Sequence, residues 1–393
     1  MSSPPQNIAS NLTQWSALFS GRYIGRRVMV TGHTGFKGGW LSHWLTLMGA
    51  EVHGLALDPD PNQTLFSDLC LSSRLASDRR MDVRDADRVR SAISEVQPEF
   101  LFHLAAQPLV RLSYEQPVET FATNVLGTAH VLDALTRPAI DCNVVIVTTD
   151  KCYENREWES SYRESDAMGG HDPYSASKGC AELVASSYRR SFAKEANERI
   201  TRIATARAGN VIGGGDWSVD RIVPDVFRAL RASQPVVVRN RTATRPWQHV
   251  LEPLSGYLWL GAALDGGGIR GVDPVQYEDS FNFGPALASN RTVAELVEQI
   301  GTHVDLTMVD RSDPKAVHEA GKLNLAIDRA FHRLGWQPVW DFNKTVAQTA
   351  TFYRDAQTET LMEWVTEQTA TYIRDAAQLR YRWAVSMRDA VAA

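Results

Sequence analysis

The sequence predicts an α/β fold: a doubly wound parallel β-sheet, with a smaller loop-rich lobe contributed by the later part of the chain. Two observations lead to this prediction. Up to residue 210, short β-branched apolar runs alternate with segments of helical spacing, which is the pattern of strand–helix–strand units. Beyond Asn210 the pattern changes, because glycine and proline interrupt shorter elements, as at Gly213-Gly214-Gly215 and Gly266-Gly267-Gly268.

The first strand–helix–strand unit shows the pattern most clearly. A β-branched run at 26–31 ends in a glycine-rich turn, residues 38–48 carry apolar side chains at helical spacing, and a second apolar run covers 52–57. The alternation then continues along the chain. Further strands are expected at 78–83, 99–106, 144–149 and 203–207, with helices at 85–94, 120–135 and 175–195.

Composition excludes several classes of protein. Of the 393 residues, 44% are hydrophobic and 22% charged, with a net charge of −5, which argues against a disordered chain and against a nucleic-acid-binding surface. The 4 cysteines form no CxxC pair, so neither a disulfide framework nor a metal site is expected. Residues 1–15 lack a signal-peptide pattern and no apolar run is long enough to span a membrane. We therefore expect a cytoplasmic protein without a membrane partner.

A glycine motif lies between the first strand and the first helix. Glycines at 32, 35 and 38 permit a tight turn and a close backbone approach, and the helix that follows presents free N–H groups and a positive dipole end. This context favours binding of a dinucleotide pyrophosphate over a simple turn. The loop residues expected at the cofactor are Gly32, Thr34, Gly35, Phe36, Lys37 and Gly38.

Asp58 bears on which dinucleotide binds. It follows the second apolar run, about 20 residues after the glycine motif, where an acid can accept hydrogen bonds from an adenosine ribose. A carboxylate there would repel a 2′-phosphate and favours NAD over NADP. The alternative is that Asp58 only forms a turn before Pro59. Lys37 also places a cation inside the loop.

A tyrosine and a lysine are spaced for joint action. Tyr174 and Lys178 stand four residues apart, so on a helix they share one face. A nearby ammonium group favours phenolate, and we expect Lys178 to lower the pKa of Tyr174 into a range useful for acid–base chemistry.

With this motif the chain resembles the extended, nucleotide-sugar-modifying branch of the short-chain dehydrogenase/reductase superfamily, whose cofactor domain is a Rossmann-type sheet. The stretch TTDKCYENREW (148–158), with Lys151 directly after Asp150, is similar to the CDP-glucose 4,6-dehydratases. The resemblance runs from about residue 25 to 345, with an echo at 362–372. Further matching stretches are TGHTGFKG (31–38), HLAAQPLVRLSYEQP (103–117), GGHDPYSASKGCAELV (169–184), ARAGNVIGGGDW (206–217) and RPWQHVLEPLSGY (245–257).

The resemblance implies a reaction and a role for five residues. CDP-glucose would be oxidised at C4 with NAD as cofactor, would lose water across C5 and C6, and would receive the hydride at C6 to give CDP-4-keto-6-deoxy-glucose, a step of deoxysugar and O-antigen biosynthesis. Tyr174 would serve the C4 hydroxyl, with Thr149 hydrogen-bonded to it and Lys178 adjusting it. Asp150 would protonate the departing C6 oxygen, and Lys151 would remove the C5 proton. Both groups would have to be neutral, which a dry site favours for an acid beside an amine.

The resemblance also implies binding residues. Asp82, Val83, Leu104, Ala105 and Ala106 would contact the cofactor together with Tyr174 and Lys178. The substrate would contact Gln107, Arg111, Asn210, Arg221, Arg245, His249 and Asn282, with Asn210 and Arg245 at the diphosphate. Alternatives stay open from the residues alone: Arg111 and Arg221 as ordinary surface cations, His249 as a packed histidine, and Trp217 and Trp247 as core residues or as stacking partners of cytosine.

Two stretches depart from the family pattern. Glu159-Ser160-Ser161-Tyr162 stands where Trp-Gly usually precedes a tyrosine, and Ala326 interrupts a more usual Leu-Asp pattern. Both are expected to affect packing on the substrate side. Two other functions remain: a 4,6-dehydratase or 4-epimerase for another nucleotide sugar (dTDP-, UDP- or GDP-linked), and an inactive NAD-binding regulator.

The expected organisation has four parts. Residues 1–24 are polar at the start and are expected to form a flexible arm. The NAD-binding domain covers 25–210, the substrate-binding lobe lies mainly in 211–345 and is interleaved with that domain, and 346–393 form a helical tail. The family suggests a homodimer or homotetramer through two long helices per subunit.

Overall fold

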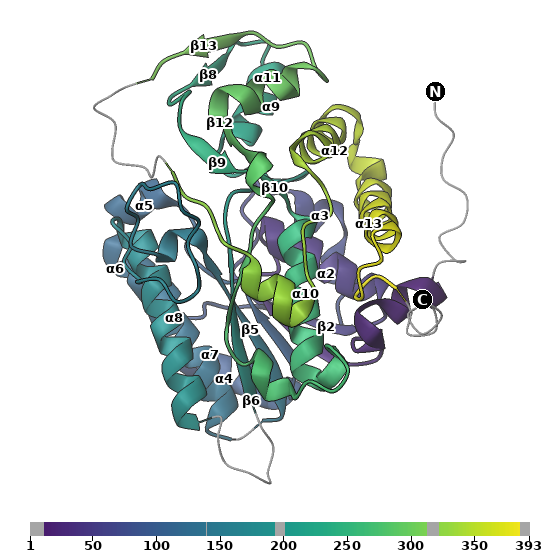
Figure 1. Ribbon diagram of the computed structural model, residues 1–393. Helices are drawn as coiled ribbons and strands as arrows, with labels where there is room; N and C mark the ends of the chain where they lie inside the picture. The colour runs from purple at the N-terminus through teal and green to yellow at the C-terminus, as the bar shows by residue number, and fades with distance from the viewer. Residues whose placement is uncertain (1–11, 139, 193–200, 313–321, 386–393) are drawn as a thin grey trace.

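A parallel seven-stranded β-sheet forms the centre of the molecule (Figure 1). The computed structural model describes residues 12–138, 140–192, 201–312 and 322–385. The strand order is β3-β2-β1-β4-β5-β6-β11, and every neighbouring pair is parallel. The first six strands have the doubly wound order, which reverses between β1 and β4. The predicted fold class is confirmed. The strands are β1 (Arg27–Thr31), β2 (Glu51–Ala56), β3 (Ser77–Arg80), β4 (Phe100–His103), β5 (Cys142–Thr149), β6 (Thr201–Ala208) and β11 (Ser280–Phe283).

Helices cover both faces of the sheet, as Figure 1 shows. On one face α4 packs on α7 and α7 on α8, over a buried core that includes Leu55, Ile93 and Val144. On the other face, α2 and α10 cover a larger core that includes Trp40 and Trp259. The main helices of these layers are α2 (Phe36–Leu47), α4 (Ala86–Val96), α7 (Gly127–Thr136), α8 (Pro173–Phe192) and α10 (Leu251–Ala262).

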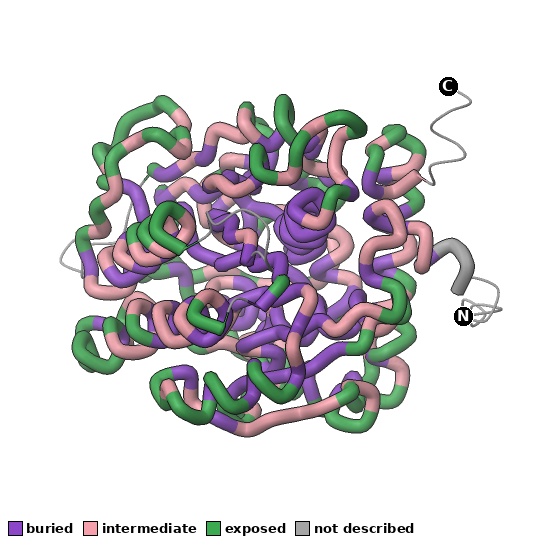
Figure 2. Tube along the Cα trace, turned by 90° about the horizontal axis from the view of Figure 1, so that it is seen from below, coloured by how far each residue is buried: buried purple, intermediate pink, exposed green. Residues whose placement is uncertain are grey.

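The central strand β5 shows why the sequence forms this sheet. All eight of its residues are buried, because helices lie on both faces, and a parallel strand of this kind is a continuous β-branched run. In the view from below in Figure 2, buried chain fills the centre of the molecule and exposed chain its rim. The seventh strand, β11, was not expected from the sequence, since four residues among turns carry no distinguishable period.

Both ends of the described chain dock on the α2 side of the sheet. Phe19 and Tyr23 are fully buried, and Phe19 stacks on Trp383 with ring centroids 5.2 Å apart. The expectation of a flexible arm is therefore wrong for residues 15–24, because their aromatic side chains complete the core. Residues 1–11 lie outside the described chain. The helical tail consists of α12 (Phe342–Asp355) and α13 (Leu361–Gln378), and α13 contacts α2.

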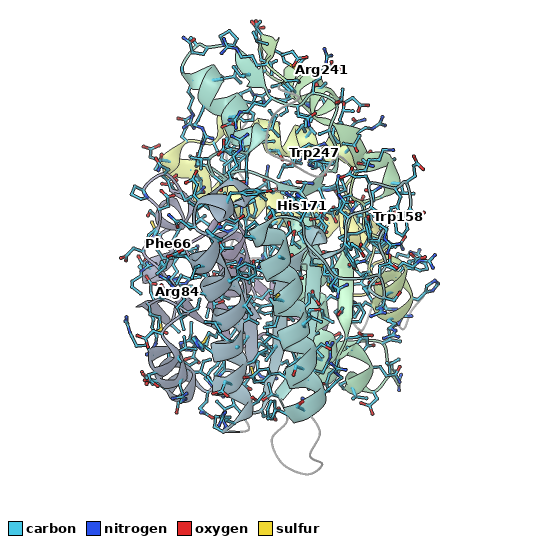
Figure 3. The ribbon with its side chains drawn as sticks, turned by 90° about the vertical axis from the view of Figure 1, so that its left-hand side faces the viewer. Phe66, Arg84, Trp158, His171, Arg241 and Trp247 are labelled. Atoms are coloured by element: carbon cyan, nitrogen blue, oxygen red, sulfur yellow. The ribbon has the colours of Figure 1, made fainter. Side chains whose placement is uncertain are left out.

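A smaller lobe lies beyond the carboxyl edge of the sheet. Figure 3 shows Arg241 at its far end and Trp247 at its base, above His171 near the start of α8. Not all of 211–345 belongs to it, since α10 and β11 join the core and the sheet. Among the described residues, no helix has the length and apolar character needed to cross a membrane. The lobe's elements are α9 (Ile222–Arg231), α11 (Val293–Gly301), β8 (Val236–Val238), β9 (Thr244–Pro246), β12 (Asn290–Thr292) and β13 (Met308–Asp310).

Candidate active site

The glycine motif forms a cradle at the carboxyl end of β1. Gly32 has φ +75°, and a Cβ atom there would lie 2.8 Å from the Ala105 backbone nitrogen. A Cβ atom on Gly38 would lie 2.1 Å from Gly32 O. Helix α2 begins at Phe36 with no side-chain cap on Gly35, so its first N–H groups have no partner within the helix. This loop fits a pyrophosphate placed at the helix N-terminus.

The next strands along the edge carry the remaining residues expected at the cofactor. The Asp58 side chain is 87% exposed just beyond β2, with Arg80 Nε 3.9 Å from Oδ1. The Arg80 guanidinium also donates to Asp78 and to Leu57 O. The Asp58 carboxylate is thus accessible to a ribose, and the Arg80 guanidinium lies close to it.

The residues expected at the cofactor beyond β3 and β4 make their contacts within the protein. Asp82 accepts from the backbone and guanidinium of Arg84, whereas Val83 is buried against Gly127. The segment Leu104–Ala106 is half-buried, and the amides of its first two residues donate to Thr31 Oγ1 at 3.1 Å.

The end of β5 carries a threonine, an acid and a lysine in succession. Thr149 ends the strand, and Asp150–Cys152 form a short 3₁₀ turn. Thr149 Oγ1 donates to Asp150 Oδ1 at 2.9 Å and accepts from the Lys151 amide at 3.4 Å. Asp150 is only 2% exposed, and burial raises the pKa of its carboxyl against the opposing charges of Lys151, Arg245 and Lys37. Asp150 is therefore suited to hold a proton.

Tyr174 and Lys178 lie on one face of α8, as their spacing predicted, but their electrostatics differ from the prediction. Burial raises the pKa of Tyr174 to about 12, while a hydrogen bond with Thr149 and the charge of Arg221 act in the opposite direction. Burial lowers the pKa of Lys178 to about 8, and its Nζ donates to Val147 O at 3.2 Å. The expected lowering of the tyrosine pKa is wrong here, because desolvation outweighs the favourable charges.

Cations gather around these groups although the chain is acidic as a whole. Burial, with the charges of Arg221 and Lys178, lowers the pKa of Lys37 to about 7, against the opposing charges of Asp150 and Asp216. Arg221 Nη1 pairs with Asp216 Oδ2 at 2.9 Å. Arg245 is 7% exposed and near enough to Asp150 to act on its pKa. The glycine loop, α9 and the lobe thus converge on one positive region.

Arg111 and Asn210 lie at the edge of this arrangement. Arg111 is exposed and pairs with Asp220 at 3.3 Å, a residue next to Arg221 in the chain. Asn210 is half-buried, and its carbonyl accepts from the Gln248 amide at 3.2 Å. It follows Gly209, where a Cβ atom would lie 2.3 Å from Asp150 Oδ2.

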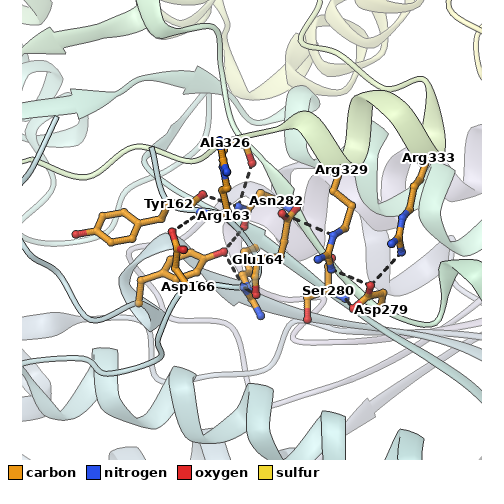
Figure 4. Close-up of polar contacts among 12 residues, drawn as sticks. Tyr162, Arg163, Glu164, Asp166, Asp279, Ser280, Asn282, Ala326, Arg329 and Arg333 are labelled. Atoms are coloured by element: carbon orange, nitrogen blue, oxygen red, sulfur yellow. Dashed lines mark hydrogen bonds and ion pairs between the residues drawn. The ribbon is translucent and has the colours of Figure 1, made fainter. Parts of the chain in front are cut away.

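Three residues expected at the substrate have structural roles instead. Asn282 is fully buried, accepts from Tyr153 Oη and donates to Tyr162 O and Ala326 O (Figure 4). Both of its amide N–H groups and its carbonyl oxygen are bonded within the protein, and the residue is fully buried, so that prediction is corrected.

Gln107 holds its own loop: Nε2 donates to Leu109 O and Thr120 Oγ1, and Oε1 accepts from the Leu109 amide. His249 is fully buried, edge-on to Trp40 and Trp340, and burial lowers its pKa to about 3. For His249 the packed alternative holds.

The two tryptophans differ in exposure. Trp247 is buried in the lobe core, and its Nε1 donates to Arg291 O. Trp217 is half-buried, edge-on to Tyr353, with the Arg231 guanidinium 4.2 Å from its ring centroid. Trp247 therefore belongs to the core.

The two departures from the family pattern contact one another. The Ala326 amide donates to Tyr162 O at 2.9 Å, and the Tyr162 amide donates to Asn324 O at 2.8 Å. The segments around 162 and 326 therefore pair as short extended pieces beside β11, as Figure 4 shows.

Sequence reasoning missed several buried polar residues near the site. Tyr257 on α10 is fully buried, and the charges of Tyr174 and Asp150 add to the burial that raises its pKa. Arg207 and Glu182 form a buried ion pair at 2.9 Å beneath Lys178. The Arg207–Glu182 pair had one signal in the sequence: Glu182 stands four residues, about one helical turn, after Lys178.

Comparisons with known proteins identify the family of the chain. A family model described as GDP-mannose 4,6-dehydratase matches residues 29–349. A CDP-glucose 4,6-dehydratase of Salmonella typhimurium is 46% identical, over 84% of this chain and 91% of that protein. A dTDP-glucose 4,6-dehydratase of Streptomyces antibioticus is 28% identical, over 84% and 92%.

A solved structure shares the fold. The dTDP-glucose 4,6-dehydratase from Streptomyces venezuelae, solved with NAD bound, superposes with a TM-score of 0.70 at 23% identity, covering 84% of this chain and 97% of that one. The chain has the alternation of strands and helices, the glycine cradle and the Thr149–Asp150–Tyr174 cluster described above. It belongs to the nucleotide-sugar 4,6-dehydratase family of enzymes.

Proposed function

We propose that this enzyme converts CDP-glucose to CDP-4-keto-6-deoxy-glucose. One observation carries the proposal: the Thr149 hydroxyl is hydrogen-bonded to both Tyr174 and Asp150, and Lys151 is the next residue. Tyr174, for oxidation at C4, and the Asp150–Lys151 pair, for elimination across C5 and C6, therefore share one site. A 4-epimerase needs no proton transfer at C5 or C6, so the buried Asp150 favours the dehydratase.

NAD is the proposed cofactor. The glycine cradle at the start of α2 would hold its pyrophosphate and Asp58 its adenosine ribose. NAD, when bound, supplies a hydride acceptor for C4 and returns the hydride to C6.

The residues of the site would then divide the proton transfers. Tyr174 takes the proton of the C4 hydroxyl. Burial raises the pKa of Tyr174, and the hydrogen bond with Thr149 and the charge of Arg221 oppose that shift and favour the phenolate form. The ketone at C4 makes the C5 proton acidic, so that Lys151 can remove it and later return a proton to C5 when C6 receives the hydride. Asp150, whose carboxyl has its pKa raised by burial, gives its proton to the departing C6 oxygen.

Local charge supports a diphosphate substrate. Lys37 and Arg245 act electrostatically on Asp150, and Arg221 acts on Tyr174. These cations favour an anion at the site although the chain carries a net charge of −5. The preference for the cytidine nucleotide rests on the relative of 46% identity, which is a CDP-glucose 4,6-dehydratase.

The test is incubation with CDP-, dTDP-, UDP- and GDP-glucose in deuterated water. We expect a 4-keto-6-deoxy sugar from CDP-glucose, with deuterium at C5. Turnover of another nucleotide sugar in preference to CDP-glucose would contradict the proposed substrate, and a C4 epimer as product would contradict the reaction.

We also propose that the enzyme is a homodimer. Helix α6 (Pro117–Phe121) and the π-helical turn Ala122–Leu126 lie beside α8. Val118, Leu126 and Leu183 on these elements are 73%, 54% and 60% exposed. Apolar side chains gathered on neighbouring helices favour contact with a second copy of the chain.

A further inference from the structure

A row of three side chains crosses the sheet one residue before the catalytic turn. Thr148 on β5 is in register with Arg207 on β6, and Arg207 is in register with Asn282 on β11. Side chains in register on neighbouring parallel strands point to the same face. Thr149, the next residue, points to the opposite face, toward the catalytic groups.

The row forms a closed network with α8. Arg207 Nε and Nη2 lie 3.0 and 2.9 Å from the two carboxylate oxygens of Glu182. Thr148 and Thr205 each donate a hydroxyl to the same carboxylate, at 2.5 and 2.7 Å. Although burial opposes it, the charge of Arg207 and these hydrogen bonds lower the pKa of Glu182. The pair is therefore ionised and fully partnered, the condition for keeping two charges inside a protein.

Tyr153 connects this network to the catalytic turn. Arg207 Nη1 donates to Tyr153 Oη at 2.6 Å, and Tyr153 Oη donates to Asn282 Oδ1 at 2.7 Å. The phenol is fully buried and stacks on Tyr162, with ring centroids 5.3 Å apart. Tyr153 is also the residue that closes the turn, because its amide donates to Asp150 O.

We propose that Tyr153 and Arg207 are positioning residues that fix the Asp150–Lys151 turn for the elimination step. A single 3₁₀ turn has little stability of its own, so its orientation depends on its two ends. The strand fixes the first end at Thr149. At the second end, the Gly169 amide donates to Cys152 O and the Glu154 amide donates to Ala167 O. The Tyr153 hydroxyl adds a side-chain anchor there, because it is held by Arg207 and, through Arg207, by Glu182 on α8. This inference rests on the proposed function.

This arrangement predicts a defect in the elimination step and not in the oxidation step. Tyr174 and Lys178 lie on α8 and do not depend on Tyr153 for their position. Loosening the turn should therefore slow removal of the C5 proton while oxidation at C4 continues. Misplacement of a reacting group by about 1 Å can cost on the order of 100-fold, and loss of one buried hydrogen bond to a charged group about tenfold.

The test compares Tyr153→Phe with a matched control. The phenylalanine keeps the ring that packs on Tyr162 and removes only the hydroxyl. Tyr23→Phe is the control. Tyr23 lies in the N-terminal segment, is equally buried, and its hydroxyl donates to Leu258 O at 2.5 Å. Single turnovers with CDP-glucose give the rate of C4 oxidation from the absorbance of reduced nicotinamide, and the rate of C5 exchange from deuterium uptake.

For Tyr153→Phe we expect C5 exchange about tenfold slower, C4 oxidation within about twofold of wild type, and accumulation of reduced nicotinamide. Tyr23→Phe should behave as wild type. Equal slowing of both steps in Tyr153→Phe, or no slowing of either, would overturn the proposal.

A second measurement does not depend on activity. Amide hydrogen exchange in the peptide covering 148–158 should be faster in Tyr153→Phe and unchanged in Tyr23→Phe. If wild-type enzyme turned over no nucleotide sugar, the proposed function would fail, and this exchange comparison would still decide whether Tyr153 holds the turn. Unchanged exchange in Tyr153→Phe would overturn the proposal.

Discussion

The Thr149 hydroxyl donates a hydrogen bond to Asp150 Oδ1 at 2.9 Å. Because the same hydroxyl is bonded to Tyr174, Thr149→Val should impair both half-reactions. We expect kcat to fall by about 10- to 100-fold, because both catalytic groups lose a partner in a buried site. Thr149→Ser keeps the hydroxyl and should retain most of the activity in a steady-state assay. Equal losses in the two variants would contradict the role given to the hydroxyl, because Thr149→Ser retains it.

Asp150→Asn should block elimination without blocking oxidation. Asparagine has the same shape but cannot give a proton to the C6 oxygen, and loss of a general acid costs roughly 100- to 10,000-fold. Product analysis should show little 6-deoxy sugar, while the absorbance of reduced nicotinamide still rises after CDP-glucose is added. Normal formation of the 6-deoxy product would remove Asp150 from the mechanism.

Arg221→Gln should move the pH dependence of oxidation. The charge of Arg221 favours the Tyr174 phenolate, and its loss also leaves the Asp216 carboxylate without its partner at 2.9 Å. Loss of the Arg221 charge raises the pKa of Tyr174. The acidic limb of the profile of kcat against pH should therefore shift to higher pH, whereas Arg221→Lys should shift it less. A shift to lower pH in Arg221→Gln would contradict this electrostatic picture.

Glu252 should make stability depend on pH. It is fully buried on α10, and burial raises its pKa to about 7 against the hydrogen bonds donated by the amides of Val339 and Trp340 and by the Tyr372 hydroxyl. The unfolded chain ionises this group at lower pH than the folded one, so its ionisation disfavours folding. The resulting penalty grows between about pH 4.5 and 7 and reaches about 3 kcal/mol.

Glu252→Gln removes this penalty. The variant should be less stable than wild type near pH 5, because one oxygen acceptor is lost, and the deficit should shrink or reverse near pH 8. Urea unfolding at both pH values measures the difference, and Glu298→Gln on the half-exposed surface of α11 serves as the control. A deficit that stays constant with pH would show that Glu252 does not titrate in this range.

Leu183→Arg should disrupt the proposed dimer. The side chain is 60% exposed on α8, so the substitution leaves the core of the subunit unchanged but places a charge in the proposed contact. Light scattering should give a dimer mass for wild type and a monomer mass for the variant. Leu379→Arg, at a residue 52% exposed after α13, should remain dimeric. A wild-type monomer would contradict the dimer.

The elements with a long or regular pattern could be predicted from the sequence. The glycine cradle, β5 and the Tyr174–Lys178 helix follow from local spacing, because each is set by backbone geometry over a few residues. Residues whose roles depend on neighbours far along the chain could not be assigned. Asn282 has an amide and stands between two phenylalanines, which suits a ligand site as well as a buried anchor. Only its contacts with Tyr162 and Ala326 decide between the two.

Electrostatic properties were the least predictable. Spacing on a helix places Lys178 near Tyr174, but the pKa of the tyrosine depends on how completely the finished fold removes water from it. The same holds for Lys37, whose lowered pKa reflects burial and the cations of α8 and α9. Helical or strand period carries no information about such three-dimensional neighbours.

The most direct test of the central claim follows one hydrogen atom. CDP-glucose labelled with deuterium at C4 is incubated with the enzyme and NAD in ordinary water, and the product is examined by NMR and mass spectrometry. The account predicts a 4-keto-6-deoxy sugar with the deuterium at C6 and a solvent hydrogen at C5. Deuterium found at C4 of an epimerised sugar, or lost to solvent, would contradict it.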